Sequence, residues 1–269
     1  MTALLLSLLL AAPGTGVKQG GLPPMLINPD AYSGTSSGGL PSNLGSVMDQ
    51  VLALPGATFG LGVVDFNTGE RMTRNGARRF FIDTPDIINA VVCVSRHESG
   101  EFPLDTLIAR DEQLWHIARR GQQGARESTQ ALRFYMGGPE VLNNWLVEEG
   151  YTSSFFPGVQ LDWEGAPEVA ASYTTVNDCL DFMEIVYEAL GELPVRRMTS
   201  NPPLSTDLEL ALGDENIVYG WISGRGDTRS INLIVSTPEG EKYGVCVLTN
   251  DLCCAAKADL GFTRIWEAL

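Results

Sequence analysis

Two aspartates at the start of an apolar run are the first candidates for chemistry in this chain. They stand in Asp83-Thr84-Pro85-Asp86, directly before the residues IINAVV. A carboxylate pair can transfer protons when its surroundings separate the two pKa values. The same residues also make a stable helix start, because Asp83 can cap the helix, Pro85 suits a first turn and Asp86 faces the positive end of the helix dipole. The sequence favours the structural interpretation and leaves the acid/base one open.

Other polar side chains give weaker signals for catalysis. Thr84 is the hydroxyl beside the aspartates, but no Lys or His follows three residues later to activate it. His97 and His116 fall near the edge of a helical region, where histidines with a structural role are the usual case. The tripeptide Arg225-Gly226-Asp227 spells a cell-adhesion motif, but Gly-Asp pairs are also common in turns, and we interpret it as a turn.

Composition excludes several classes of function. The formal net charge of -15 repels phosphate backbones, so we expect no nucleic-acid partner. The five cysteines show no metal-ligand spacing, and with two histidines they give no zinc ligand set. We therefore expect no metal and no cofactor, and we interpret most of the cysteines as buried thiols.

The first 43 residues differ in composition from the rest of the chain. The apolar run from Ala3 to Ala12 is too short to span a bilayer, which needs about 20 residues, so we expect a protein that does not span a membrane. No Lys or Arg precedes the leucines, as one does in most secretory signals. An apolar arm that docks on another protein and a signal peptide both stay open. Residues 17–42, rich in Gly, Pro and Ser, predict an extended linker.

From residue 44 onward the patterns predict one domain, with strands near both ends and helices between them. Residues 44–52 have helical spacing, and ATFGLGVVDFNTGERMTRNG predicts a β-hairpin turning at Asn67-Thr68-Gly69. The stretch from Leu104 to about Leu190 has mostly helical patterns, so a helical subdomain is expected at about residues 100–200. Three strand patterns follow, NIVYGWI, RSINLIVST and KYGVCVLT, and then an amphipathic helix. The predicted fold is α/β: an antiparallel sheet built from both ends of domain 44–269, flanked by helices and interrupted by the helical subdomain.

Three local stretches resemble the serine β-lactamase and penicillin-binding-protein family. GVVDFNTGER resembles the hairpin before the family's nucleophile helix. Residues 137–150, GGPEVLNNWLVEEG, are similar to the class A helix that opens with Gly-Gly-Pro, and Ser172–Asp178 resembles a later helix start. The resemblance covers roughly residues 44–269 and implies the β-lactamase-like fold.

The resemblance also implies where the family's three catalytic motifs would fall. The Ser-x-x-Lys falls on Asp83-Thr84-Pro85-Asp86, the Ser-Asp-Asn on or near Gly124-Ala125-Arg126, and the Lys-Thr-Gly near Ile222-Ser223-Gly224. Only the hydroxyl of Ser223 and the glycine Gly224 keep the family's residue types. Ser128 could supply the serine of the Ser-Asp-Asn motif only if the alignment of this loop were shifted by four residues. The acids Asp162, Glu164 and Glu168 lie where class A enzymes place their deacylating loop, but without its Glu-x-x-x-Asn pattern.

These positions favour a pseudo-enzyme, although an enzyme is not excluded. We expect a catalytically inactive β-lactamase-like module that joins a larger assembly through residues 1–43, with a phage tail or capsid appendage as one setting and a peptidoglycan fragment as one ligand. The alternatives are an exported divergent hydrolase that uses Thr84, Ser128 or the aspartate pair, and an envelope protein that binds cell-wall fragments. The expected location is accordingly a virion, the cell envelope or the exterior.

Overall fold

The computed structural model describes residues 39–83, 86–109, 112–122, 137–156, 172–200, 202–224 and 226–269. The described residues all belong to one compact unit, Gly34–Leu269. The predicted arm and most of the predicted linker therefore lie outside the described residues. At the start of the described part, Leu40 is buried, and its backbone N donates a hydrogen bond to Glu70 Oε2 at 2.8 Å.

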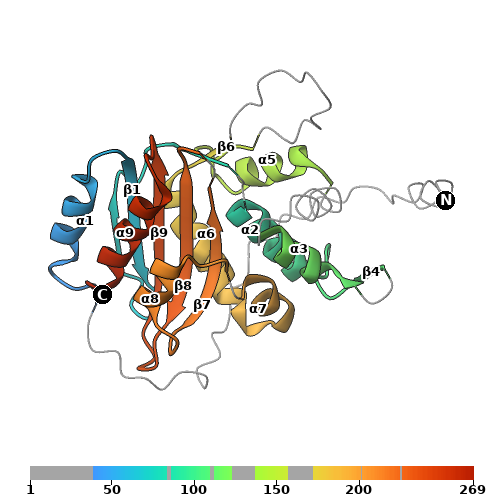
Figure 1. The fold of residues 1–269 in the computed structure, drawn as a ribbon. Coiled ribbons are helices and arrows are strands. Elements are labelled where there is room, and N and C mark those ends of the chain that lie inside the picture. Colours follow the sequence, from blue (N-terminus) through green and yellow to red (C-terminus); the bar gives the residue numbers. More distant parts are fainter. Residues whose placement is uncertain are drawn as a thin grey trace. The chain divides into compact units, whose positions relative to one another are not determined.

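Figure 1 shows the helices and strands of this unit, with strands near both ends of the sequence and mostly helices between them. The helices are α1 (Leu44–Leu52), α2 (Asp86–Glu98), α3 (Leu114–Gln122), α5 (Pro139–Glu148), α6 (Val176–Glu188), the 3-10 turn η2 (Ala189–Gly191), α7 (Leu193–Thr199), α8 (Thr206–Leu212) and α9 (Ala255–Trp266). The strands are β1 (Thr58–Asp65), β2 (Arg71–Arg74), β3 (Phe80–Ile82), β4 (Leu107–Ala109), β5 (Glu112–Gln113), β6 (Ser172–Thr174), β7 (Ile217–Ser223), β8 (Arg229–Ser236) and β9 (Lys242–Asn250).

The main sheet joins strands from both ends of the sequence. Its order is β2-β1-β9-β8-β7, and every neighbouring pair is antiparallel. β1 lies beside β9 from the pair Thr58 and Asn250 to the pair Asp65 and Tyr243. The predicted antiparallel sheet flanked by helices is therefore confirmed.

The first hairpin turns where the sequence predicts. Asp65, which is 1% exposed, accepts hydrogen bonds from Asn67 N and Thr68 Oγ1, both at 2.8 Å. Gly69 completes the turn with φ +75°, a conformation that favours glycine. An aspartate that hydrogen-bonds residues two and three positions later fixes such a turn locally.

Each face of the sheet is covered by helices, which gives the domain two apolar cores. On one face α6 packs against β1, β8 and β9, and α2 packs against α6. On the other face α9 packs against β8 and β9, with α1 and α8 beside it. Gly62 lets α6 approach closely, because a Cβ at this position would lie 2.5 Å from a Val176 methyl group.

Short strands interrupt the region for which the sequence predicts mostly helix. β6 pairs with β3, with Phe80 opposite Thr174, and β4 pairs with β5. Strands of two or three residues give too short a pattern to be recognised, and β3 and β6 are brought together only by the tertiary fold. α6 begins at Val176, after the strand residues Ser172–Thr174, and the Thr175 hydroxyl caps it by accepting a hydrogen bond from Asp178 N at 3.1 Å.

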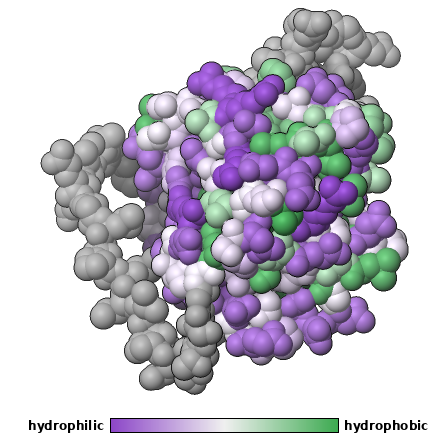
Figure 2. Space-filling view, turned by 90° about the vertical axis from the view of Figure 1, so that its left-hand side faces the viewer, coloured by the Kyte–Doolittle hydropathy of each residue, from purple (hydrophilic) through white to green (hydrophobic). Residues whose placement is uncertain are grey.

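Figure 2 shows the side of this unit toward α1, where hydrophilic residues predominate and apolar residues lie in small groups between them. Such a mixture is ordinary for a surface in contact with water. Within the described ranges, none of the helices combines the length and the apolar composition that crossing a bilayer requires.

Candidate functional site

The predicted motif residues that fall within the described ranges lie on or directly beside α2 and β7, which pack together. Asp83 is exposed just after β3, and Asp86 is the first residue of α2, with 7% of its surface exposed. α2 packs against β7, the edge strand that ends at Ser223 and is followed by Gly224. Thr84, Pro85, Gly124 and Ser128 lie outside the described residues, as do the acids Asp162, Glu164 and Glu168.

The end of β7 makes a tight connection that requires a glycine. Ser223 lies opposite Ser230 on β8, and a Cβ at Gly224 would lie 2.6 Å from the Thr228 carbonyl oxygen. Glycine allows this close approach because it has no side chain. Gly224 therefore has a structural reason at this position.

The buried amide of Asn232 lies on the face of the sheet that α2 and α6 cover. Trp221, Asn232 and Cys246 are opposite one another on β7, β8 and β9, so their side chains share a face. Trp221 and Cys246 belong to the core formed with α2 and α6, so this shared face is the one that α2 and α6 cover. Asn232, 1% exposed, donates a hydrogen bond from Nδ2 to Ser230 Oγ at 2.7 Å.

Some polar atoms at this place have no hydrogen-bond partner within the described part of the chain. They are the Asn89 Oδ1 on α2, the Trp221 Nε1 on β7 and the Asn232 Oδ1 on β8. Their residues are 3% exposed or less. Buried polar groups are nearly always paired, so an unpaired group calls for an explanation, such as an ordered water, a bound ion or a catalytic role.

We call this set the α2–β7 site. It consists of Asp86 and Asn89 on α2, Trp221 and Ser223 on β7, and Ser230 and Asn232 on β8. Asp86 and Ser223 were predicted from the sequence, whereas the other four residues were not. The available signal was a polar residue inside each of two apolar runs, IINAVV and SINLIV.

The positions of the lysines limit the chemistry of the α2–β7 site. The chain has only Lys18, Lys242 and Lys257, and Lys18 lies outside the described residues. Asn250, the last residue of β9, lies beside the segment that precedes α2. Its side-chain amide forms two hydrogen bonds of 3.1 Å with the Phe81 backbone. Lys242 begins this nine-residue strand and therefore lies about 27 Å along β9 from Asn250. Burial lowers the pKa of Lys242.

Lys257 is also placed away from the α2–β7 site. It belongs to α9, which packs on the opposite face of the sheet, and its ammonium donates a hydrogen bond to the Pro55 carbonyl oxygen. Neither described lysine stands where it could activate a nucleophile at the start of α2.

The two histidines have neighbours that explain them structurally. His97 Nδ1 accepts a hydrogen bond from Leu104 N at 3.1 Å, which ties the end of α2 to the following loop. His97 lies eleven residues after Asp86, about 16 Å along the helix. The ring of His116 lies against Trp115, with 3.7 Å between the ring centroids.

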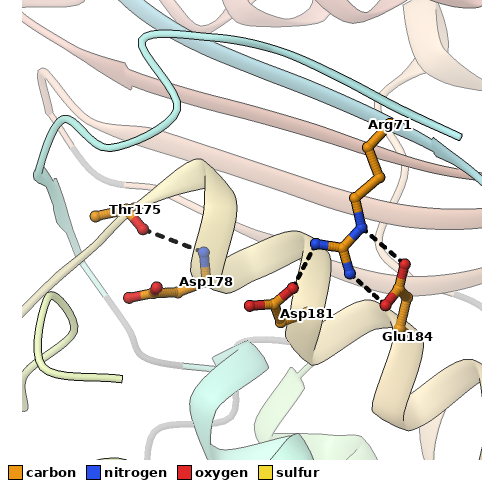
Figure 3. A network of polar contacts seen from close by, with 5 residues as sticks. All are labelled: Arg71, Thr175, Asp178, Asp181 and Glu184. Carbon is orange, nitrogen blue, oxygen red and sulfur yellow. Dashed lines mark hydrogen bonds and ion pairs between the residues drawn. The ribbon is translucent and has the colours of Figure 1, made fainter. Parts of the chain in front are cut away.

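A second polar cluster ties α6 to the edge of the sheet (Figure 3). Arg71 on β2 donates to Asp181 Oδ1 at 2.5 Å, and its Nε donates to Glu184 Oε1 at 2.9 Å. Asp178 Oδ2 accepts a hydrogen bond from Ser154 Oγ at 2.6 Å, and burial raises the pKa of Asp178. These contacts account for the acids drawn in Figure 3, so we interpret the cluster as structural.

No known family model matches this chain, and no curated protein matches it. Solved structures do match it. A β-lactamase from Xanthomonas campestris has 17% identity and a TM-score of 0.66, with 84% of this chain and 95% of that chain covered. The reconstructed class A β-lactamase of the last common ancestor of Gram-negative bacteria has 16% identity and a TM-score of 0.67, with 84% and 98% covered.

A mutant of the chromosome-encoded β-lactamase of Vibrio parahaemolyticus has 13% identity and a TM-score of 0.65, with 83% of this chain and 97% of that chain covered. At these identities the likeness concerns the fold, and it extends over nearly the whole length of the related structures. The structure and these comparisons together show that the chain has the β-lactamase-like fold.

Proposed function

We propose that this chain is a β-lactamase-like domain without acyl-transfer activity, which serves as a structural or binding module in a larger assembly. The observation that carries the proposal is the position of the lysines. Serine enzymes of this fold use a lysine near the nucleophile to lower the cost of its deprotonation. Lys242 and Lys257 lie at the far end of β9 and on the opposite face of the sheet.

The side chains present at the α2–β7 site suit binding better than nucleophilic catalysis. Asp86 is a carboxylate in the first turn of α2, where the helix dipole stabilises its charge. A carboxylate that attacked an acyl group would form an anhydride, a product less stable than the ester a serine forms. The amides of Asn89 and Asn232 and the hydroxyls of Ser223 and Ser230 can donate and accept hydrogen bonds without any such step.

The nature of the assembly is the second part of the proposal. Residues 1–43 combine an apolar run with a Gly/Pro-rich linker, a composition suited to reaching a neighbouring protein while the domain folds separately. A phage virion is one such assembly, since phages of walled bacteria meet peptidoglycan during entry. A peptidoglycan fragment is the ligand class that the fold suggests for the module.

Hydrolysis of a chromogenic cephalosporin tests the loss of activity. We expect the wild type, Asp83→Asn and Asp86→Asn to give the buffer rate alike. The matched control is Asp207→Asn, which removes an exposed carboxylate from the first turn of α8. A wild-type rate that disappears in Asp83→Asn or Asp86→Asn and persists in Asp207→Asn would overturn the proposal in favour of a divergent hydrolase.

Calorimetry with soluble peptidoglycan fragments tests the binding role separately. We expect heat of binding to the wild type and a weaker affinity for Asn232→Ala, which removes an amide from the α2–β7 site. Equal affinities for both proteins would show that the α2–β7 site does not bind the fragment. An absence of binding would contradict the binding role and favour a purely structural one.

A further inference from the structure

The cysteines of this protein fall into two groups with different surroundings. Cys93, Cys179 and Cys246 are buried, and burial raises the pKa of Cys93 to about 12. Cys253 and Cys254 are exposed and adjacent, and their sulfur atoms lie 3.8 Å apart. The cysteines of the first group act as small apolar side chains in a core, whereas those of the second group lie at the surface.

The chain geometry brings the two exposed sulfurs together. Neighbouring side chains in an extended strand point to opposite sides, which would separate the sulfurs. Here the chain leaves β9, passes Asp251 at φ +55° and enters α9, whose N-cap is Cys254. Cys253 N donates a hydrogen bond to the Gly56 carbonyl oxygen at 2.9 Å, which fixes the turn.

The surroundings leave the sulfurs available to a ligand. The Cys254 side chain makes no capping hydrogen bond to α9, and the first turn of this helix holds no acidic residue. A Cβ at Gly56 would lie 3.1 Å from Cys253 Sγ and 3.5 Å from Lys257 Nζ, so the sulfur and the ammonium flank the same glycine. Both thiols are therefore accessible and close together, and Cys253 lies near the Lys257 ammonium.

We propose that Cys253 and Cys254 form a dithiol site that binds a soft, thiophilic centre through both sulfurs at once. Soft centres prefer sulfur ligands, and two sulfurs on one rigid turn bind without a second association step. The competing form is a disulfide between the two residues. Adjacent Cα atoms are about 3.8 Å apart, below the roughly 4.4–6.8 Å of ordinary disulfides, so that bond would be strained and easily reduced. The dithiol is accordingly the form available to the ligand.

Phenylarsine oxide is a suitable probe because its trivalent arsenic takes two sulfurs. Two arsenic–sulfur bonds form and the arsenic–oxygen bond breaks. The oxygen leaves as water with the two thiol protons, and no atom changes oxidation state. A single thiol forms only one such bond and exchanges readily with other thiols, so retention of the probe distinguishes the pair from isolated cysteines.

The test uses the full chain, reduced and then freed of reductant, in wild-type form and as C253S, C254S and the double variant. After treatment with the probe, each sample is washed with a monothiol and its intact mass is recorded. We expect the wild type to retain the arsenical until a dithiol removes it. We expect each single variant to lose it roughly a hundredfold more readily. The double variant, which keeps the buried cysteines, should not be labelled.

Three results would overturn the proposal. They are retention by a single variant equal to that of the wild type, labelling of the double variant, and a wild-type mass that shows an internal disulfide in place of the arsenical. Thermal unfolding of each variant checks that the serine substitutions at these exposed positions leave the fold intact.

Discussion

The helices α2 and α6 cover the same face of the sheet and pack against each other, but they use their polar residues differently. At the start of α6, Thr175 caps the helix and Asp178 accepts a hydrogen bond from Ser154. In the following turns, Asp181 and Glu184 form ion pairs with Arg71. At the start of α2, Asp86 stands in the first turn, and one turn later the buried Asn89 Oδ1 has no partner among the described residues. An acid in the first turn is thus common to both helices, and the feature that distinguishes α2 is the buried amide of Asn89.

Removal of a large core side chain from α6 should give the largest effect. Phe182 is fully buried, and its ring lies edge-on to that of Tyr151 with 4.7 Å between the centroids. We expect Phe182→Ala to lower the free energy of unfolding by about 3–5 kcal/mol, because it leaves a cavity. Urea unfolding measures the loss. Leu210→Ala, at a position 78% exposed on α8, is the control and should change little; comparable losses in both would contradict the assignment of α6 to the core.

Loss of the α6 cap should have a moderate effect. Thr175 Oγ1 accepts the hydrogen bond of Asp178 N, so Thr175→Ala leaves that donor without its partner. We expect a loss of about 1 kcal/mol in the free energy of unfolding, measured by urea titration. Thr175→Ser keeps the oxygen and should retain most of the stability. Equal losses in both variants would show that the methyl group, and not the cap, matters.

The corresponding change in α2 should have a smaller effect. Asp86→Asn removes the charge that faces the helix dipole while keeping the shape of the side chain, so we expect a loss of about 0.3–1 kcal/mol. Thermal unfolding measures it, and added salt should reduce the difference from the wild type. A gain in stability would instead indicate a strained carboxylate, which is typical of a catalytic group.

The smallest expected effect concerns the pH dependence of stability. Burial raises the pKa of Asp178 above its ordinary value, so the folded state binds this proton more tightly than the unfolded state. Stability therefore falls as the pH rises from the unfolded pKa of about 3.9 through the folded pKa. Asp178→Asn should remove this part of the slope. Unfolding free energies of the two proteins across that range check it, and parallel curves would contradict the raised pKa.

Local signals predicted most of the main sheet. The turn at Asn67-Thr68-Gly69 and the strand patterns that became β7, β8 and β9 each depend on residues close in sequence. The pairing of β3 with β6 was missed, because it joins segments about ninety residues apart that are three residues long. Long-range pairs of this kind leave no periodic pattern in either segment.

The site was harder to predict than the fold. A polar residue inside an apolar run, such as Asn89 or Asn232, indicates burial but not the atoms that it meets. Only the register of β7 with β8 shows that Trp221 and Asn232 lie opposite each other. The predicted positions Asp83, Asp86, Ser223 and Gly224 are placed by the structure, whereas Gly124 lies outside the described residues.

Intact mass after incubation with a penicillin is the most direct test of the central claim. The protein is isolated from its native source, treated with excess penicillin and denatured, and its intact mass is measured by mass spectrometry together with that of an untreated sample. We predict identical masses, because neither of the described lysines, Lys242 and Lys257, stands beside the start of α2 to activate a nucleophile. A covalent acyl adduct on the treated protein would contradict the account and would identify this chain as an acyl-transfer enzyme.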